Sequence, residues 1–181
     1  MNDVYGFYED AKKEITIRGY AGEVEYVNNL HFNKLEVKEL FYQYVFVVVS
    51  SGMKNQVAAK IYDKFRRSGD DPDTIGHPGK REAIRRAGRK YPWWFSDLQQ
   101  STDKLAYLET LPWIGPITKY HLARNIGLDC AKPDRHLMRL AERFQFKNVQ
   151  AMCQGIADRT GDRIGVVDVI LWRYCNLKGS G

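Results

Sequence analysis

Apolar residues recur at helical spacing along most of this 181-residue chain. Within residues 35–50 they start on one face and become continuous over Tyr44–Val49. A β-branched run of this kind is compatible with a buried helix or with a strand. Leu35, Leu40 and Tyr44 keep helical spacing, and no turn residue interrupts them. We therefore predict a helix here.

The same periodicity predicts further helices along the rest of the chain. They lie at residues 56–67, 80–90, 92–100, 102–110, 117–126, 133–144, 147–159 and 163–175. Pro112, Gly115 and Pro116 mark a tight turn between two of them, and Pro133 is expected to occupy the first turn of the next helix. No series of alternating strands appears. We predict an all-α fold.

Charge and cysteine content restrict the function only weakly. The 28 Lys and Arg residues against 22 Asp and Glu residues give a net charge of +6, which is weak evidence for a polyanionic partner. Cys130, Cys153 and Cys175 are too widely spaced for a disulfide framework or a metal site. Neither a secretory signal nor an apolar run of the roughly 20 residues that a membrane helix needs is present. We expect a soluble intracellular protein, in the cytoplasm and nucleoid or in a nucleus.

The segment LPWIGP, residues 111–116, joins two predicted helices. The N-terminus of the second helix presents backbone N–H groups and the positive end of the helix dipole, which together suit a DNA phosphate. Gly115, Ile117, Thr118 and Lys119 lie at this end and are candidate DNA contacts. The alternative is an ordinary turn between helices.

Asp134 follows Gly115 by 19 residues and lies in the first turn of its own predicted helix. An isolated Asp at this position is usually a helix cap, and the helix dipole favours its negative charge. At a fixed distance from a phosphate-binding hairpin, the carboxylate is also placed to face the sugar of the nucleotide whose phosphate the hairpin binds.

Together these segments resemble the helix–hairpin–helix DNA glycosylase superfamily, which includes endonuclease III, mismatch-thymine and alkylpurine glycosylases. The family pattern is L-P-G-x-G, a helix, and then V-D-x-H-[VIL]-x-R; this chain has L-P-W-I-G at 111–115 and D-R-H-L-M-R at 134–139. Residues 46–65 and 165–175 resemble a wedge loop with its flanking helices and the last core helix. The resemblance covers roughly residues 35–175.

The resemblance implies a two-lobed helical fold with the active site in the cleft between the lobes. We expect residues 35–140 to form one lobe, which holds the wedge loop (50–56), the hairpin (111–116) and Asp134, and residues 1–34 plus 141–181 to form the other. A monomer with this fold flips a damaged or mispaired base out of double-stranded DNA and hydrolyses its N-glycosidic bond. Asp134 matches the catalytic carboxylate, which stabilises the oxocarbenium-like sugar. Which base is excised stays open.

The chain departs from the family at the position of the lyase lysine. Members with lyase activity carry Lys two residues after the last Gly of the hairpin, where this chain has Ile117. The amine of a Schiff base is therefore missing there, and we predict a monofunctional glycosylase. One alternative is a lyase that uses a relocated lysine, Lys119 or Lys132. Another is a non-enzymatic helix–hairpin–helix module that only binds DNA.

Two further departures concern the hairpin and the cofactor. Trp113 stands where the family has its first hairpin Gly, so a backbone conformation that needs Gly would change. We expect its side chain to pack on the core, and the alternative is that it lies against DNA. Cys175 alone cannot hold the iron–sulfur cluster of endonuclease III-like members. We expect no required cofactor and no metal ligands, apart from a monovalent cation at the hairpin.

Two more segments are candidate DNA contacts. The helix at 80–90 is rich in basic residues, and Lys80, Arg85 and Arg89 are candidates to follow the DNA backbone, although a solvated basic face is equally typical. The wedge loop is expected to insert a side chain into the gap left by the flipped base. Its candidate residues are Met53, Asn55 and Gln56.

Overall fold

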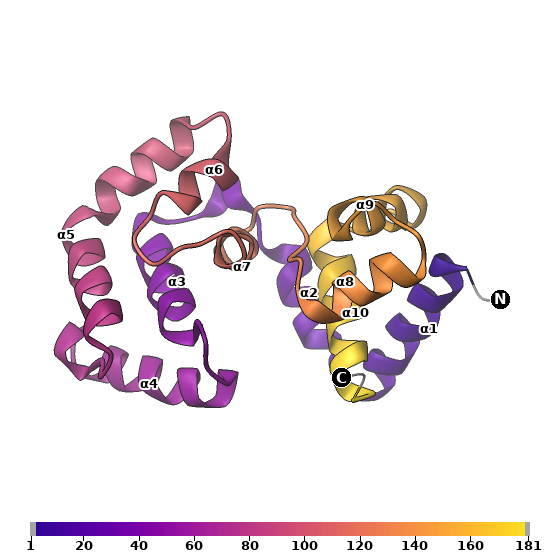
Figure 1. Ribbon diagram of the computed structural model, residues 1–181, viewed down its shortest axis with the longest axis horizontal. Coiled ribbons are helices and arrows are strands. Elements are labelled where there is room, and N and C mark those ends of the chain that lie inside the picture. The colour runs from indigo at the N-terminus through magenta and orange to yellow at the C-terminus, as the bar shows by residue number, and fades with distance from the viewer. Residues whose placement is uncertain (1–2, 180–181) are drawn as a thin grey trace. The chain divides into compact units, whose positions relative to one another are not determined.

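The computed structural model describes residues 3–179, except for the side chain of Asn55, and all of its regular elements in that range are helices (Figure 1). The chain divides into two compact units. Residues 34–126 form one, here called the central unit. Residues up to 33 together with those from 127 onward form the other, the terminal unit. The all-α prediction is confirmed.

The central unit is built around an apolar helix, α3 (Val37–Ser50). Tyr44 and the valines from Val45 to Val49 are almost completely buried, and three helices pack against α3: α4 (Asn55–Arg67), α5 (Pro78–Gln100) and α7 (Thr118–Asn125). A short 3₁₀ turn, η2 (Pro72–Thr74), and α6 (Lys104–Glu109) complete the unit. Because α3 is covered on several sides, its sequence can be apolar all round. The β-branched run therefore forms a helix, as predicted.

The helix α5 is continuous across Pro92, where we had expected two helices, 80–90 and 92–100. Proline removes one backbone hydrogen bond and crowds the carbonyl four residues earlier, and such sites bend helices. The bend of α5 is visible in Figure 1. Ile84 and Ala87 before the proline and Leu98 after it are all buried. Packing on both sides of Pro92 therefore holds the two halves in one helix.

The terminal unit is built around a second apolar helix, α10 (Ile164–Leu177). It packs against α1 (Val4–Ile17), α2 (Ala21–Asn29), α8 (Arg135–Arg143) and α9 (Val149–Thr160). The N-terminal segment, for which the sequence offered no motif, contributes α1 through its buried face of Val4, Tyr8, Ala11 and Ile15. A 3₁₀ turn, η1 (Phe32–Lys34), leads into the central unit.

The boundaries of the two units differ from those we expected. We placed Asp134 with the hairpin in a lobe of residues 35–140, but residues 127–140 pack with the chain termini. The guanidinium of Arg163 explains this, since it donates hydrogen bonds to the carbonyls of Leu30 (2.7 Å) and Gly127 (3.3 Å). Gly127 has a left-handed φ of 85°, and a Cβ there would lie 2.6 Å from the backbone of His31. This close approach requires glycine and fixes residue 127 beside the end of α2.

None of the helices in residues 3–179 is both long enough and apolar enough to cross a membrane.

Candidate functional site

Asp134 is the N-cap of α8, which begins at Arg135. Its Oδ1 accepts hydrogen bonds from the backbone N–H groups of His136 (2.9 Å) and Leu137 (3.0 Å). Among the described residues, Oδ2 has no hydrogen-bond donor. Pro133 lies before the cap, so the expectation that it occupies the first helical turn was wrong. The carboxylate is half-buried and fixed through one oxygen, which leaves the other free to act on a ligand.

The backbone that leads into Asp134 is held by two side chains that the sequence analysis did not single out. Gln150 of α9 accepts a hydrogen bond from the backbone N–H of Ala131 at 3.0 Å. Asp168 of α10 accepts one from that of Lys132 at 3.5 Å. Asp168 is 1% exposed. An acid inside the apolar run GVVDVILW was the available signal, because a buried carboxylate needs hydrogen-bond donors.

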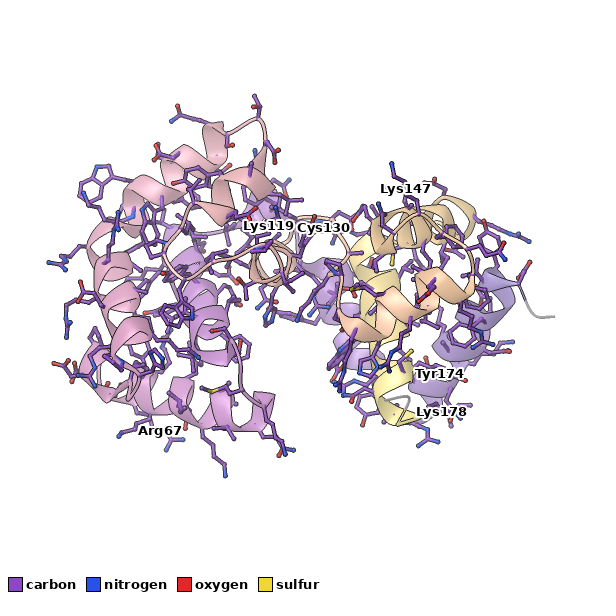
Figure 2. All side chains as sticks on the ribbon, viewed as in Figure 1. Arg67, Lys119, Cys130, Lys147, Tyr174 and Lys178 are labelled. Atoms are coloured by element: carbon purple, nitrogen blue, oxygen red, sulfur yellow. The ribbon has the colours of Figure 1, made fainter. Side chains whose placement is uncertain are left out.

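A pocket of about 390 Å³ extends along α8 from His136 to Arg143. His136, Arg139 and Arg143 of α8 line it, and Tyr174, Cys175 and Lys178 of α10 face them. Figure 2 shows Tyr174 and Lys178 projecting from the C-terminal part of α10. The Nδ1 atom of His136 is buried and has no hydrogen-bond partner among the described residues. The pocket lining therefore includes three basic side chains, Arg139, Arg143 and Lys178, on the two helices that face each other.

The three cysteines are buried as free thiols. Burial raises the pKa of the Cys175 thiol, and the Asp134 carboxylate raises it further. Burial and the carboxylates of Asp168 and Asp134 likewise raise the pKa of Cys153. Both thiols are therefore protonated at neutral pH and are poor metal ligands. In the part of the chain that the structure describes, His, Cys, Asp and Glu side chains form no group of three that could hold a metal ion.

The hairpin has a closed turn followed by the open N-terminus of α7. The backbone N–H of Ile114 donates to the carbonyl of Leu111 (3.1 Å), and the Tyr44 hydroxyl donates to that of Pro112 (2.6 Å). The N-cap residue of α7 is Ile117, whose side chain makes no capping hydrogen bond. The backbone N–H groups of Lys119 and Tyr120 already donate to the carbonyls of Gly115 (3.0 Å) and Ile117 (3.2 Å), so the candidate phosphate site lies at the residues before them.

The candidate residues of the hairpin have different surroundings. Ile117 is exposed. Gly115 donates its backbone N–H to the Thr118 hydroxyl at 2.7 Å, so Thr118 stabilises the turn. Lys119 forms an ion pair with Glu109, and the hydrogen bond that its ammonium donates to the Glu109 carboxylate raises the pKa of the ammonium. The charge of Lys119 is thus largely directed into the protein.

Trp113 keeps the left-handed backbone of a glycine position, with a φ of 66°. Its indole packs edge-on against the imidazole of His77, with the ring centres 5.1 Å apart. The indole thus contacts neighbouring side chains but lies outside the buried core, since 43% of the residue is exposed.

The wedge loop is a turn between α3 and α4. Within it, Met53 is half-buried, while Gln56 is exposed in the first turn of α4. Asn55 begins α4, and its side chain lies outside the described residues. The structure confirms the turn, and insertion into DNA stays a prediction.

The basic helix at 80–90 does not present all three of its candidate residues to solvent. Lys80 is only 5% exposed, so its assignment to a DNA-binding surface was wrong. Its ammonium donates to backbone carbonyls at the end of α3, and burial lowers its pKa. Arg85 pairs with Asp73 (2.7 Å) and Glu82 (2.9 Å). Arg89 lies 3.8 Å from Glu82 and is the most exposed of the three.

Two solved structures share this fold. The 8-oxoguanine glycosylase/lyase of Methanocaldococcus jannaschii, bound to a 15-mer DNA containing 8-oxoguanine, is 15% identical, with a TM-score of 0.69 over 90% of this chain and 94% of that chain. The 8-oxoguanine DNA glycosylase of Thermotoga maritima is 16% identical, with a TM-score of 0.67 over 93% and 95%. No family model and no curated protein matches the chain in sequence. The chain thus has the fold of the helix–hairpin–helix DNA glycosylases, as predicted.

The cap geometry predicts how substitutions at Asp134 affect stability. Asp134→Ala leaves two N–H groups of α8 without an acceptor and is expected to lower the free energy of unfolding by about 1 kcal/mol. Asp134→Asn keeps an acceptor oxygen and should stay close to the unsubstituted protein, because Asn and Asp rank together at N-caps. Urea unfolding followed by circular dichroism measures both. An Asn variant as unstable as the Ala variant would contradict the cap.

Proposed function

We propose that this protein is a DNA glycosylase that flips a damaged or mispaired base out of double-stranded DNA and hydrolyses its N-glycosidic bond. One observation carries the proposal. In a chain with the glycosylase fold, Asp134 is fixed through Oδ1, while Oδ2 has no donor among the described residues. A cap uses one carboxylate oxygen, and the second oxygen of Asp134 is left available for a ligand. A glycosylase needs a fixed negative charge beside the sugar.

The reaction separates charge at the sugar. The bond between C1′ and the base nitrogen breaks, the electron pair leaves with the base, and positive charge develops on C1′ and the ring oxygen. The Asp134 carboxylate stabilises this charge through Oδ2 and orients a water molecule toward C1′. The water adds its oxygen to C1′ and loses a proton, and the departing base gains one. The products are the free base and an abasic site.

The DNA contacts proposed for this reaction come from both units. The uncapped N-terminus of α7, with Gly115, Ile117 and Thr118, binds a phosphate, and the wedge loop enters the space of the flipped base. Arg139 and Arg143 supply positive charge in the pocket beside α8. We propose that each unit supplies its own DNA contacts, the central unit through the hairpin and the wedge loop, and the terminal unit through the side chains beside α8.

The first substrate to test is 8-oxoguanine, because both proteins that share this fold act on it. Flipping costs least at damaged or mispaired bases. Alkylated purines and mismatched thymine or uracil belong in the same series, since pocket side chains diverge freely on one fold. As a DNA-repair enzyme the protein would act inside the cell.

The proposed reaction is monofunctional and needs no cofactor. An exposed Ile117 at the lyase position and an ion pair that keeps Lys119 protonated both disfavour a Schiff base. A monovalent cation at the hairpin stays a prediction. The carbonyls of Leu111, Pro112 and Gly115 already accept hydrogen bonds, so a cation would have to share them. No step of the reaction passes through it.

The carboxylate test uses Asp134→Asn on a duplex with a single 8-oxoguanine, or on whichever lesion duplex the unsubstituted protein cleaves best. Single-turnover base release should fall at least about a hundredfold, because a charged stabiliser of the transition state is lost. Binding of the same duplex should change by less than about twofold, since the amide keeps the cap. Undiminished release by Asp134→Asn would refute the role of Asp134.

Borohydride trapping tests the absence of lyase chemistry. We expect the unsubstituted protein to give no covalent adduct with the lesion duplex, while abasic sites accumulate. The Ile117→Lys variant is the positive control, because it restores an amine at the lyase position, and it should give an adduct. A wild-type adduct that disappears in Lys119→Arg or Lys132→Arg would instead establish a relocated lysine.

A further inference from the structure

Trp113 has a backbone conformation that is unusual for a bulky residue. Its φ of 66° lies in the left-handed region, which Gly occupies without strain and large side chains rarely enter. Strained conformations persist where surrounding contacts hold them, and they cluster at functional sites. The contacts of this indole must therefore outweigh the backbone strain at Trp113.

The indole connects the hairpin to two other segments of the central unit. Its Nε1 donates a hydrogen bond of 2.9 Å to Oγ of Ser51, the first residue of the wedge-loop turn. The ring also lies against the start of α5: a Cβ added at Gly79 would come within 2.5 Å of its Cζ3 atom. One side chain thus contacts both the wedge loop and α5.

Ser51 is held from a second side by Lys80. The ammonium of Lys80 donates to the carbonyl of Ser51 at 2.6 Å and to that of Val49 at 2.9 Å. The Ser51 hydroxyl in turn donates to the carbonyl of Val48 at 2.8 Å. The buried ammonium therefore anchors the backbone at the end of α3, and the indole anchors the Ser51 side chain. Gly52, with a φ of 72°, follows at once and is the flexible point of the turn.

We propose that Trp113 is a positioning residue that links the wedge loop to the phosphate-binding hairpin, so that the two move as one element when a base is extruded. The proposal rests on the proposed glycosylase function. The hairpin holds the DNA backbone, and the wedge loop fills the stack. When the wedge loop is linked to the hairpin, its distance from the bound phosphate stays constant. Without the indole, Lys80 and the local hydrogen bonds of the turn would still hold the loop, but no side chain would link it to the hairpin.

Four variants distinguish the contacts of the Trp113 side chain from the backbone conformation at residue 113. Trp113→Gly removes the indole and leaves a residue that adopts a φ of 66° without strain, so the hairpin keeps its shape. Ser51→Ala removes the acceptor of the indole N–H together with the hydrogen bond that the hydroxyl donates to the carbonyl of Val48. Gly79→Ala keeps Trp113 but displaces its ring. Trp93→Ala is the matched control, because Trp93 is an exposed indole of the same unit, far from the loop in sequence.

Hydrogen exchange of the free protein tests the link without DNA. In Trp113→Gly and Gly79→Ala, the backbone amides of residues 51–54 should exchange about tenfold faster, the change expected when a hydrogen bond that closes the loop is lost. In Ser51→Ala they should exchange faster as well, and in Trp93→Ala at the wild-type rate. The helical circular dichroism signal confirms folding in each case. Unchanged exchange in both Trp113→Gly and Gly79→Ala would overturn the link.

A base-flipping assay tests whether the link between Trp113 and the wedge loop matters for extrusion of the base. The probe is a duplex with 2-aminopurine next to a single 8-oxoguanine, whose fluorescence rises when the lesion leaves the stack. Trp113→Gly should lower the flipping signal and the single-turnover rate about tenfold, with binding of undamaged duplex changed less than about twofold. Faster loop exchange with undiminished flipping would overturn the positioning role. If the unsubstituted protein neither flips nor releases a base in any lesion duplex, the glycosylase proposal fails. The link between Trp113 and the wedge loop is then tested by hydrogen exchange alone.

Discussion

The arrangement of the candidate site depends on one pair of hydrogen bonds, from the first-turn amides of α8 to Oδ1 of Asp134. These bonds end the preceding loop, start the helix and fix the carboxylate at the same time. They would be of little use if α8 could move. Leu137 and Leu140 bury one face of α8 in the core of the terminal unit. Gln150 and Asp168 accept hydrogen bonds from the backbone of the loop that precedes α8. The carboxylate is therefore positioned by packing as much as by its own cap.

Positive charge is distributed less simply than the net charge of +6 suggests. Arg85 and Lys119 form ion pairs with acidic neighbours, and Lys80 is buried against backbone carbonyls. Exposed pairs of this kind contribute little to stability, yet they reduce the charge offered to a polyanion. Lys178 in the pocket beside α8 is paired with Glu14, and the guanidinium of Arg143 there lies over the rings of Phe7 and Phe144. The net charge therefore overstates the positive charge that the protein offers to a polyanion.

The fold was predictable where the sequence carries a local signal. The apolar runs became α3 and α10, and Asp134 was predicted as a cap because it precedes an amphipathic helix.

Predictions failed where tertiary contacts determine the structure. Pro92 lies inside a helix because buried residues flank it on both sides. The unit boundary lies at residue 127 because Arg163, distant in sequence, reaches its carbonyl. Lys80 looked like part of a basic face, and only the end of α3 explains its burial. The link between Trp113 and Ser51 spans 62 residues and leaves no pattern in the sequence.

The most direct measurement is the product released by the unsubstituted protein from a panel of duplexes, each with one lesion or mismatch. The panel includes 8-oxoguanine, an alkylated purine, and thymine or uracil opposite guanine. Chromatography with mass detection identifies any free base, and alkaline cleavage reveals abasic sites. The account predicts one free base, with the strand intact until alkali is added. Tight binding of every duplex without release of any base would contradict it and would leave a module that only binds DNA.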